Sequence, residues 1–219
     1  MQELEIYIIT ILAIAFTVAY SLGSRYNYKI QKKIWKEISG EIKPYSGKVS
    51  FKGFGSSGFK IACSPSMGKL KKLEILIILL SREILLYYLF SKCRRKHDTI
   101  VVKSNFYVVP NFSLEIVKKG TKIHKELIKK PNLTELRHEK LSEQFFLTSS
   151  NPDAASKFLS NKDIIQRIIK LNTLMNRLSI TSEEPQLLIS CSIRENVISQ
   201  VLNLAFACGR VMEQIRNDM

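Results

Sequence analysis

The chain has 219 residues, of which 45% are hydrophobic and 24% are charged, so it can bury a core, and wholesale disorder is excluded. Six prolines and nine glycines exclude a collagen-like or low-complexity chain. The net charge of +15 is typical of proteins that meet RNA, DNA or an anionic membrane surface. Most of this excess, +11, lies in residues 26–100.

The first predicted element is a membrane anchor, because residues 6–24 contain no charged side chain. A helix of that length spans about 28 Å, close to the ~30 Å hydrocarbon core of a bilayer. A cleaved signal peptide carries positive charge before its apolar run, whereas here Glu3 and Glu5 precede the run. We therefore expect an uncleaved single-pass anchor in residues 1–25. Basic residues follow the run, which predicts the N-terminus outside and the remaining chain in the cytoplasm.

Small and hydroxyl side chains mark one face of this predicted anchor. Thr10, Ala13 and Thr17 are spaced i, i+3 and i+7, so they share one side of a helix. Small and hydroxyl residues on one face are typical of contacts between transmembrane helices. We expect this face to meet a membrane partner.

Residues 26–44 are predicted as a juxtamembrane basic helix that ends around residues 40–44. Its four lysines nearest the anchor are expected to be attracted to anionic headgroups, by about 1 kcal/mol each. Twelve further basic residues in 26–100 lie farther away and need another explanation. The four lysines are Lys29, Lys32, Lys33 and Lys36.

A second apolar run, residues 73–90, resembles a second span, but Arg82 and Glu83 fall in its middle. Each charge there would cost about 2.5–3.5 kcal/mol in a membrane. The run is therefore predicted to be one long buried helix of the folded domain, opened by residues 66–69. Two basic clusters bracket it: Lys69, Lys71 and Lys72 before it, and Lys92, Arg94, Arg95 and Lys96 after it.

The rest of residues 45–219 reads as a mixed domain. Period-2 alternation predicts a hairpin from residues 48–54 and 58–63, and further strands at 98–106, 112–117 and 145–148. Thr121 and Asn151 are predicted helix caps, and helices are expected at 163–176 and 195–215. Residues 178–181 and 186–191 form a predicted hairpin. Strands in sequence between helices give an α+β fold: a single transmembrane helix followed by a mixed α+β cytosolic domain.

Catalytic and metal-binding motifs are absent from the sequence. The four cysteines have no CxxC pair, and the three histidines do not stand at zinc-site spacing from them. Residues 53–58 are rich in glycine but lack the GK[ST] ending of a phosphate loop. We expect no enzyme activity, no metal and no cofactor.

Three stretches carry a resemblance to a known family: residues 58–63 with glycine and cysteine at their ends, residues 70–82 ending at Arg82, and residues 98–105 led by Asp98. Together they resemble the cytosolic domain of calumin, the coiled-coil-containing endoplasmic-reticulum protein of the PAT intramembrane chaperone complex. Residues 158–166, 187–191 and the final helix follow in a similar order. The resemblance covers most of residues 45–215 and describes a short, archaeal-like relative without the basic coiled-coil tail.

This resemblance implies a non-enzymatic factor that assists insertion and folding of multispanning membrane proteins beside the Sec translocon and ribosome. Its implied partners are the Sec translocon, a small Asterix-like membrane protein, client membrane proteins and ribosomal RNA. The anchor would shield polar transmembrane segments, which are costly in lipid until they find partners. The basic clusters would face ribosomal RNA, translocon loops or anionic lipid.

Two other functions remain open from the sequence. One is a membrane-tethered nucleic-acid-binding protein, whose affinity would fall steeply with salt, although no RRM, KH or helix-turn-helix pattern is present. The other is an anionic-lipid-binding protein whose charge serves the bilayer alone.

Overall fold

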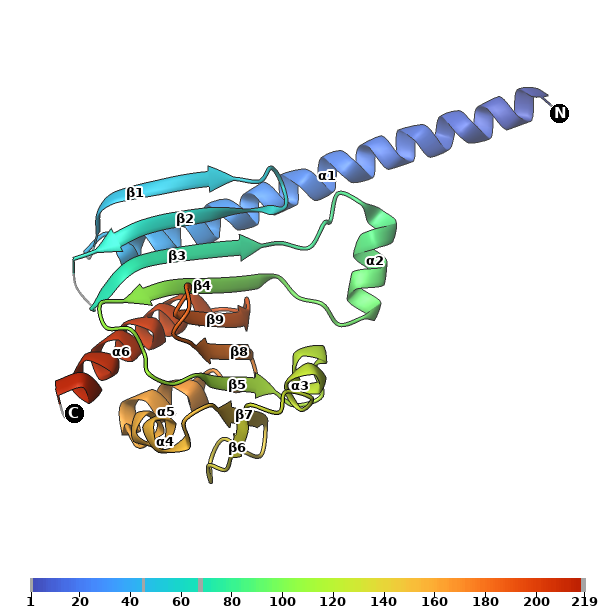
Figure 1. The fold of residues 1–219 in the computed structure, drawn as a ribbon. Helices are drawn as coiled ribbons and strands as arrows, with labels where there is room; N and C mark the ends of the chain where they lie inside the picture. The colour runs from blue at the N-terminus through green and yellow to red at the C-terminus, as the bar shows by residue number, and fades with distance from the viewer. Residues whose placement is uncertain (1, 45, 67–68, 218–219) are drawn as a thin grey trace.

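A computed structural model describes residues 2–44, 46–66 and 69–217 of the chain (Figure 1). It has an N-terminal apolar helix, α1, over Gln2–Ile42, followed by an antiparallel sheet with helices, so the predicted α+β class is confirmed. The sheet order is β1-β2-β3-β4-β9-β8-β5-β7-β6. The strands are β1 Ser46–Gly53, β2 Gly58–Pro65, β3 Leu70–Ile78, β4 Thr99–Phe106, β5 Leu114–Lys118, β6 Thr134–Leu136, β7 Phe145–Ser149, β8 Met175–Ile180 and β9 Leu187–Ser192.

Helices cover one face of this sheet, and the opposite face is partly exposed. In Figure 1, α1 lies behind β1–β3 and α6 lies behind β4 and β9. Alternate residues along the strands are buried against these helices, as Leu73, Ile75 and Ile77 of β3 are. The helices that follow α1 are α2 Leu85–Cys93, α3 Lys122–Leu127, α4 Pro152–Leu159, α5 Lys162–Lys170 and α6 Val197–Asn217.

The first helix has two halves with different surroundings. Its second half packs on the domain, where Ile34, Ile38 and Ile42 are buried in the core. Its first half projects away from the domain with its large apolar side chains exposed (Figure 1). This half is long and apolar enough to cross a membrane. The expected anchor and juxtamembrane helix are thus one continuous helix.

The prediction of one long helix over residues 73–90 is wrong. Residues 70–78 form β3, residues 79–84 form a turn, and α2 begins only at Leu85. In β3 the inward residues alternate with Glu74 and Leu76, and Glu74 makes an ion pair of 2.7 Å with Lys60 of β2. The period-2 pattern is hidden because the outward positions include Leu and Ile, so the run is apolar at both parities.

Most other elements agree with the sequence. The hairpin β1–β2, the strands β4, β5 and β7, the antiparallel pair β8–β9 and the last helix lie where they are predicted. Thr121 caps α3 and Asn151 caps α4, since their side chains accept hydrogen bonds from His124 N and Ala154 N. The helix expected over 163–176 ends at Lys170, because Met175 already pairs with Cys191 in the sheet. The short strand β6 was not predicted.

The registers define two ends of the sheet. Ile78 pairs with Thr99, Thr99 with Ser192, and Cys191 with Met175, so these residues lie at one end. Asn27 of α1 contacts the turn after β3 at this same end, where α1 leaves the domain. We call it the exit end. Leu70 and its partner Phe106 lie at the opposite, far end.

Candidate functional site

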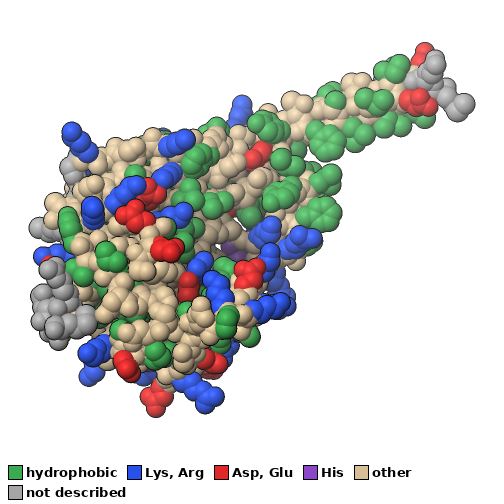
Figure 2. All heavy atoms as spheres, in the orientation of Figure 1, with side chains coloured by type: hydrophobic (Ala, Val, Ile, Leu, Met, Phe, Trp, Pro, Cys, Tyr) green, Lys and Arg blue, Asp and Glu red, His purple; other side chains and the backbone are tan. Residues whose placement is uncertain are grey.

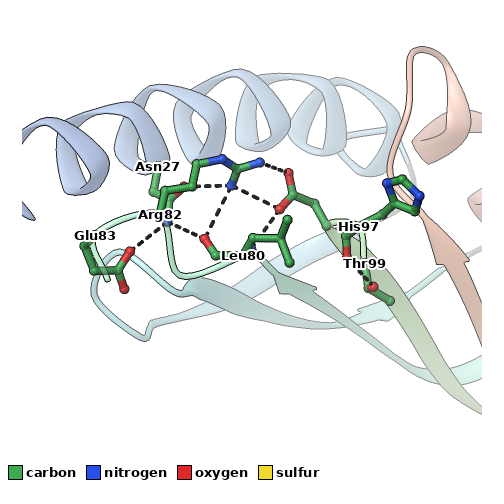
Figure 3. Close-up of polar contacts among 7 residues, drawn as sticks. Asn27, Leu80, Arg82, Glu83, His97 and Thr99 are labelled. Atoms are coloured by element: carbon green, nitrogen blue, oxygen red, sulfur yellow. Dashed lines mark hydrogen bonds and ion pairs between the residues drawn. The ribbon is translucent and has the colours of Figure 1, made fainter. Parts of the chain in front are cut away.

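A buried polar joint holds α1 to the turn between β3 and α2 (Figure 3). The guanidinium of Arg82 makes two hydrogen bonds to the Asp98 carboxylate, of 3.1 and 2.7 Å, and a third of 2.8 Å to Asn27 Oδ1. Asp98 Oδ1 also accepts a hydrogen bond of 2.8 Å from Leu80 N. The bidentate pair fixes the turn to the start of β4, and the hydrogen bond to Asn27 ties the turn to α1.

Asn27 is the α1 residue at the centre of this joint. It is fully buried, and its Nδ2 donates to Leu80 O at 2.9 Å and to Glu83 Oε2 at 3.2 Å. One turn earlier, a Cβ on Gly23 would stand 2.3 Å from the carbonyl oxygen of Arg82, so only glycine permits this close approach. The joint therefore fixes the turn between β3 and α2 against residues 23–27 of α1.

The charge on Arg82 is retained in this environment. Burial works against the charged form, but the hydrogen bonds and negative charge of Asp98 outweigh it and raise the pKa of Arg82. The rings of Tyr26 and Tyr88 also lie 5.5 and 5.8 Å from the guanidinium carbon. The joint thus keeps a charged arginine beside Asp98 at the base of the projecting helix.

The helix α2 has the opposite orientation to an ordinary surface helix, because its apolar side chains face outward and its buried residue is polar. Its one buried residue is Ser91, whereas Leu86 and Phe90 are 60% and 66% exposed. Positions i, i+1, i+4, i+5 and i+8 share one side of a helix, and in α2 this outward side is entirely apolar. We call it the outward face of α2; its residues are Leu85, Leu86, Leu89, Phe90 and Cys93.

Along the axis of α1, this outward face lies level with the end of the charge-free part of the helix. Residues 79–83 contact α1 at Gly23 and Asn27, and the charge-free run ends at Ser24. The exposed Ile84 and the helix α2 follow directly (Figure 1). Exposed apolar side chains of the projecting half of α1 and of α2 thus lie at the same end of the domain.

The exit end is also the basic end of the domain. Residues 92–96 form the end of α2 and the turn after it, and residues 118–130 leave β5 and contain α3, so both stretches lie there. Together they carry ten Lys and Arg and one acidic residue, Glu126. Figure 2 shows blue basic side chains below the green apolar patch at the base of the projecting helix. We call residues 92–96 and 118–130 the basic rim.

A cavity of about 740 Å³ lies between α2 and the strand ends at the exit end. Ser91 and Tyr87 of α2 form one wall, and Thr99, Ser192 and Asn176 stand at the ends of β4, β9 and β8. None of the lining residues, all of which the structure describes, is Asp or Glu. We call it the basic hollow; its charged lining residues are Arg95, Lys96, Lys118 and Arg194, with the imidazole of His97 beside them.

The predicted partner face of the anchor is exposed. Thr10 and Thr17 donate hydrogen bonds of 2.8 Å to Ile6 O and Ala13 O, so both hydroxyls are satisfied within the helix. Contact with a membrane partner through Thr10, Ala13 and Thr17 stays a prediction.

The four juxtamembrane lysines lie on the part of α1 that packs on the domain. All of them are exposed. They follow the joint in the chain and point away from the core formed by Ile34 and Ile38. The residues are Lys29, Lys32, Lys33 and Lys36.

The two basic clusters were expected to bracket one helix, but the structure places them at opposite ends of the sheet. Lys69, Lys71 and Lys72 stand at the start of β3, at the far end, whereas Lys92, Arg94, Arg95 and Lys96 stand at the exit end. Lys69 pairs with Glu213 at 3.0 Å and Lys72 with Glu74 at 2.8 Å, so two of the three far-end charges are compensated. The second cluster belongs to the basic rim.

The cysteines do not form a metal site in the described part of the chain, where no group of three or more metal-ligating side chains occurs. Burial raises the pKa of Cys63 to about 11 and those of Cys191 and Cys208 to about 12. Cys93 is exposed on the outward face of α2. It is therefore the reactive thiol among the four.

Asn27, Gly23, Lys118 and Arg194 are site residues that sequence reasoning missed. Asn27 follows an apolar run and precedes a basic one, and a polar amide between two such runs is the only local signal of its role. Lys118 and Arg194 are distant in sequence from residues 92–96, and only the sheet register brings them to the same end.

No known protein family matches the chain, and no curated protein matches it. The crystal structure of the mycobacterial trehalose monomycolate transport factor A is similar, with a TM-score of 0.43 and 11% identity. The alignment covers 82% of this chain and 92% of that one. A likeness of this size carries no information about function.

Proposed function

We propose that this chain is a single-pass membrane protein that binds anionic lipid and holds its folded domain against the bilayer through α2. The observation that carries the proposal is the outward apolar face of α2, located where the charge-free run of α1 ends. With α1 spanning the bilayer, this height corresponds to the headgroup region, so α2 lies in the plane of the interface.

The energetics favour this arrangement over exposure to water. The transfer of half-exposed Leu and Phe side chains into the interface gains on the order of 1 kcal/mol each. The basic rim adds about 1 kcal/mol for each Lys or Arg brought near an anionic surface. The apolar face and the basic rim act on the same side of the domain, so both terms favour one orientation.

The side of the membrane is part of the same proposal. Basic residues are favoured on the cytoplasmic side of a transmembrane segment, and the lysines in the second half of α1 support a cytoplasmic domain. Cys93 gives a direct test. A membrane-impermeant maleimide should leave Cys93 unmodified in intact cells and modify it once the membrane is opened with detergent.

The experiment that tests docking is a depth measurement on the full-length protein. A nitroxide attached to Cys93 reports whether α2 lies in lipid or in water, through its relative collision rates with oxygen and with a water-soluble nickel chelate. The protein is placed in nanodiscs of phosphatidylcholine alone or mixed with phosphatidylglycerol. We expect the probe at the interface in the mixed discs and a shallower position in the neutral ones.

A matched pair of variants separates docking from general effects. Leu86→Asp adds a charge to the outward face of α2, and we expect the Cys93 probe to move into water. Val109→Asp makes the same kind of change at an exposed apolar residue near the far end and should leave the probe depth unchanged. A Cys93 probe fully in water in wild-type protein and mixed discs would rule out the proposal.

The insertion factor implied by the resemblance to calumin is a second proposal. The feature that favours it is the exposed apolar side chains of α1 and α2, against which a transmembrane segment of another protein can pack. A photo-crosslinker on Cys93 tests it in native membranes. Crosslinks to Sec translocon subunits, a small membrane protein and nascent clients support it, and crosslinks to lipid alone contradict it.

A further inference from the structure

We infer that the basic hollow binds the phosphate-bearing headgroup of a single anionic phospholipid, an inference that rests on the proposed docking of α2. The hollow therefore distinguishes one lipid headgroup from another, whereas the outward face of α2 only attaches the domain to a bilayer.

The charge of the hollow carries the first step of the argument. Its lining includes two arginines and two lysines from three different segments of the chain and no acidic residue. Lys118 donates a hydrogen bond of 3.0 Å to Thr173 O, which fixes its ammonium group at the rim of the cavity. Four uncompensated cations around one cavity bind an anion, and phosphate offers the oxygens that arginine recognises in pairs.

The backbone at Arg95 carries the second step. Arg95 follows the end of α2 with a φ of 53°, the left-handed conformation that favours glycine at this position of a helix end. The amide N–H groups of Arg95 and Lys96 close the helix on the carbonyls of Lys92 and Ser91. An arginine in a glycine position, with its side chain in the cavity wall, indicates that the side chain is needed there.

The location of the hollow indicates a lipid and not a soluble phosphate compound. Its wall includes α2, whose opposite side faces the bilayer in the proposed orientation. Tyr87 and Ile78, which are 50% and 46% exposed, lie in the lining and provide an apolar path beside the cations. A headgroup in the hollow can thus keep its acyl chains along α2 in the bilayer.

Native mass spectrometry of the full-length protein in a neutral detergent tests the inference. The probe is short-chain phosphatidylglycerol, with phosphatidylcholine of the same chain length as the neutral comparison. We expect one retained phosphatidylglycerol, and about tenfold weaker retention in Arg95→Gln, the effect expected for loss of one charge-assisted hydrogen bond. Arg94→Gln removes the same charge one residue away, outside the hollow, and should retain the lipid as wild type does.

A second variant guards against unfolding as the cause. Arg95→Gly relieves the backbone at a left-handed position, so it should keep or raise the melting temperature while it loses lipid as Arg95→Gln does. Equal losses in Arg94→Gln and Arg95→Gln would overturn the inference, because binding would then be diffuse attraction to the basic rim. Glycerol 3-phosphate that binds as tightly as the lipid would overturn the assignment to a lipid.

The two proposals fail in different ways. A Cys93 probe at the interface with no retained phosphatidylglycerol refutes the hollow and leaves docking intact. A retained lipid with the probe in water refutes docking instead.

Discussion

The helices α2 and α5 have nine residues each and opposite orientations of their apolar sides. In α5, Ile164, Ile165 and Ile168 are buried and the polar residues face out. In α2 the single buried residue is Ser91, and leucines and a phenylalanine face out. The domain covers the apolar side of α5 with α6 and α4, whereas the leucines and the phenylalanine of α2 are exposed.

This difference separates residues that stabilise the fold from residues that serve a surface. An apolar side chain contributes to folding only where the chain itself removes it from water. The chain buries those of α5, whereas it leaves those of α2 exposed, and in the proposed arrangement lipid covers them. Mutations in the two helices should therefore affect different measurements.

The largest difference is expected between Ile168→Ala and Leu86→Ala. Ile168 is fully buried, so its truncation should lower the free energy of unfolding by about 3 kcal/mol. Leu86 is 60% exposed, and its truncation should change the same quantity by less than about 0.5 kcal/mol. Urea unfolding of the full chain in mild detergent measures both. A loss at Leu86 as large as that at Ile168 would mean that α2 is packed against protein.

The ion pairs at α2 and at α5 should also differ in how much each stabilises the fold. Asp98→Ala leaves the Arg82 guanidinium, which is 13% exposed, without its carboxylate, and should cost about 2 kcal/mol. Asp163→Ala removes the exposed partner of Arg167 within α5 and should cost about 0.5 kcal/mol. Amide hydrogen exchange checks the location: residues 79–93 should exchange faster in Asp98→Ala and keep their rates in Asp163→Ala.

Two glycines of α1 sharpen the role of the joint. Alanine is the better helix former by about 1 kcal/mol, and at Gly40, where a Cβ meets nothing within 4 Å, the substitution should stabilise the protein. At Gly23 the same change drives a methyl group into the Arg82 carbonyl and should destabilise it, by about 1 kcal/mol or more. Melting temperatures of the two variants should move in opposite directions. Stabilisation by Gly23→Ala would show that the turn does not contact α1.

The smallest effect concerns Glu74, in the middle of β3 and away from α2. Hydrogen bonds from Lys60 and Lys72 lower the pKa of Glu74 below its usual 4.5. Because the pKa is lowered in the folded protein, this stabilisation is present at neutral pH and is lost as pH falls through the lowered value. Glu74→Gln should therefore lower the melting temperature slightly at pH 7 and have no effect at strongly acidic pH. An equal decrease at both pH values would contradict the assignment.

Local sequence patterns predicted the parts of the fold that depend on local chemistry. The hairpin β1–β2, the caps at Thr121 and Asn151 and the strand β4 follow from alternation and capping residues. The strand β3 was missed because Leu76 and Ile78 are apolar on its outer side, so an alternating pattern looked like a continuous run. The sequence of one strand does not show which strands will pair with it, or whether apolar side chains are tolerated on its outer face.

The candidate site was predicted only in part, for a similar reason. The basic residues 92–96 are visible as a charge cluster in the sequence, and they do belong to the exit end. The inversion of α2 depends on which side the domain leaves uncovered, and the hollow depends on a register that brings Lys118 and Arg194 to residues 92–96. These are long-range properties that no spacing rule contains.

The packing of α1 on α6 bears on how the protein is made. During synthesis α1 emerges first, and α6 follows all nine of the described strands. Buried Ile34 and Ile38 of α1 belong to the same core as Val201 and Leu202 of α6. With α1 in a bilayer, as we propose, its apolar half is committed to the membrane before α6 is translated, so the core is completed on a chain tethered at its beginning. In the proposed arrangement, the membrane is then the surface on which this domain folds as well as the one on which it rests.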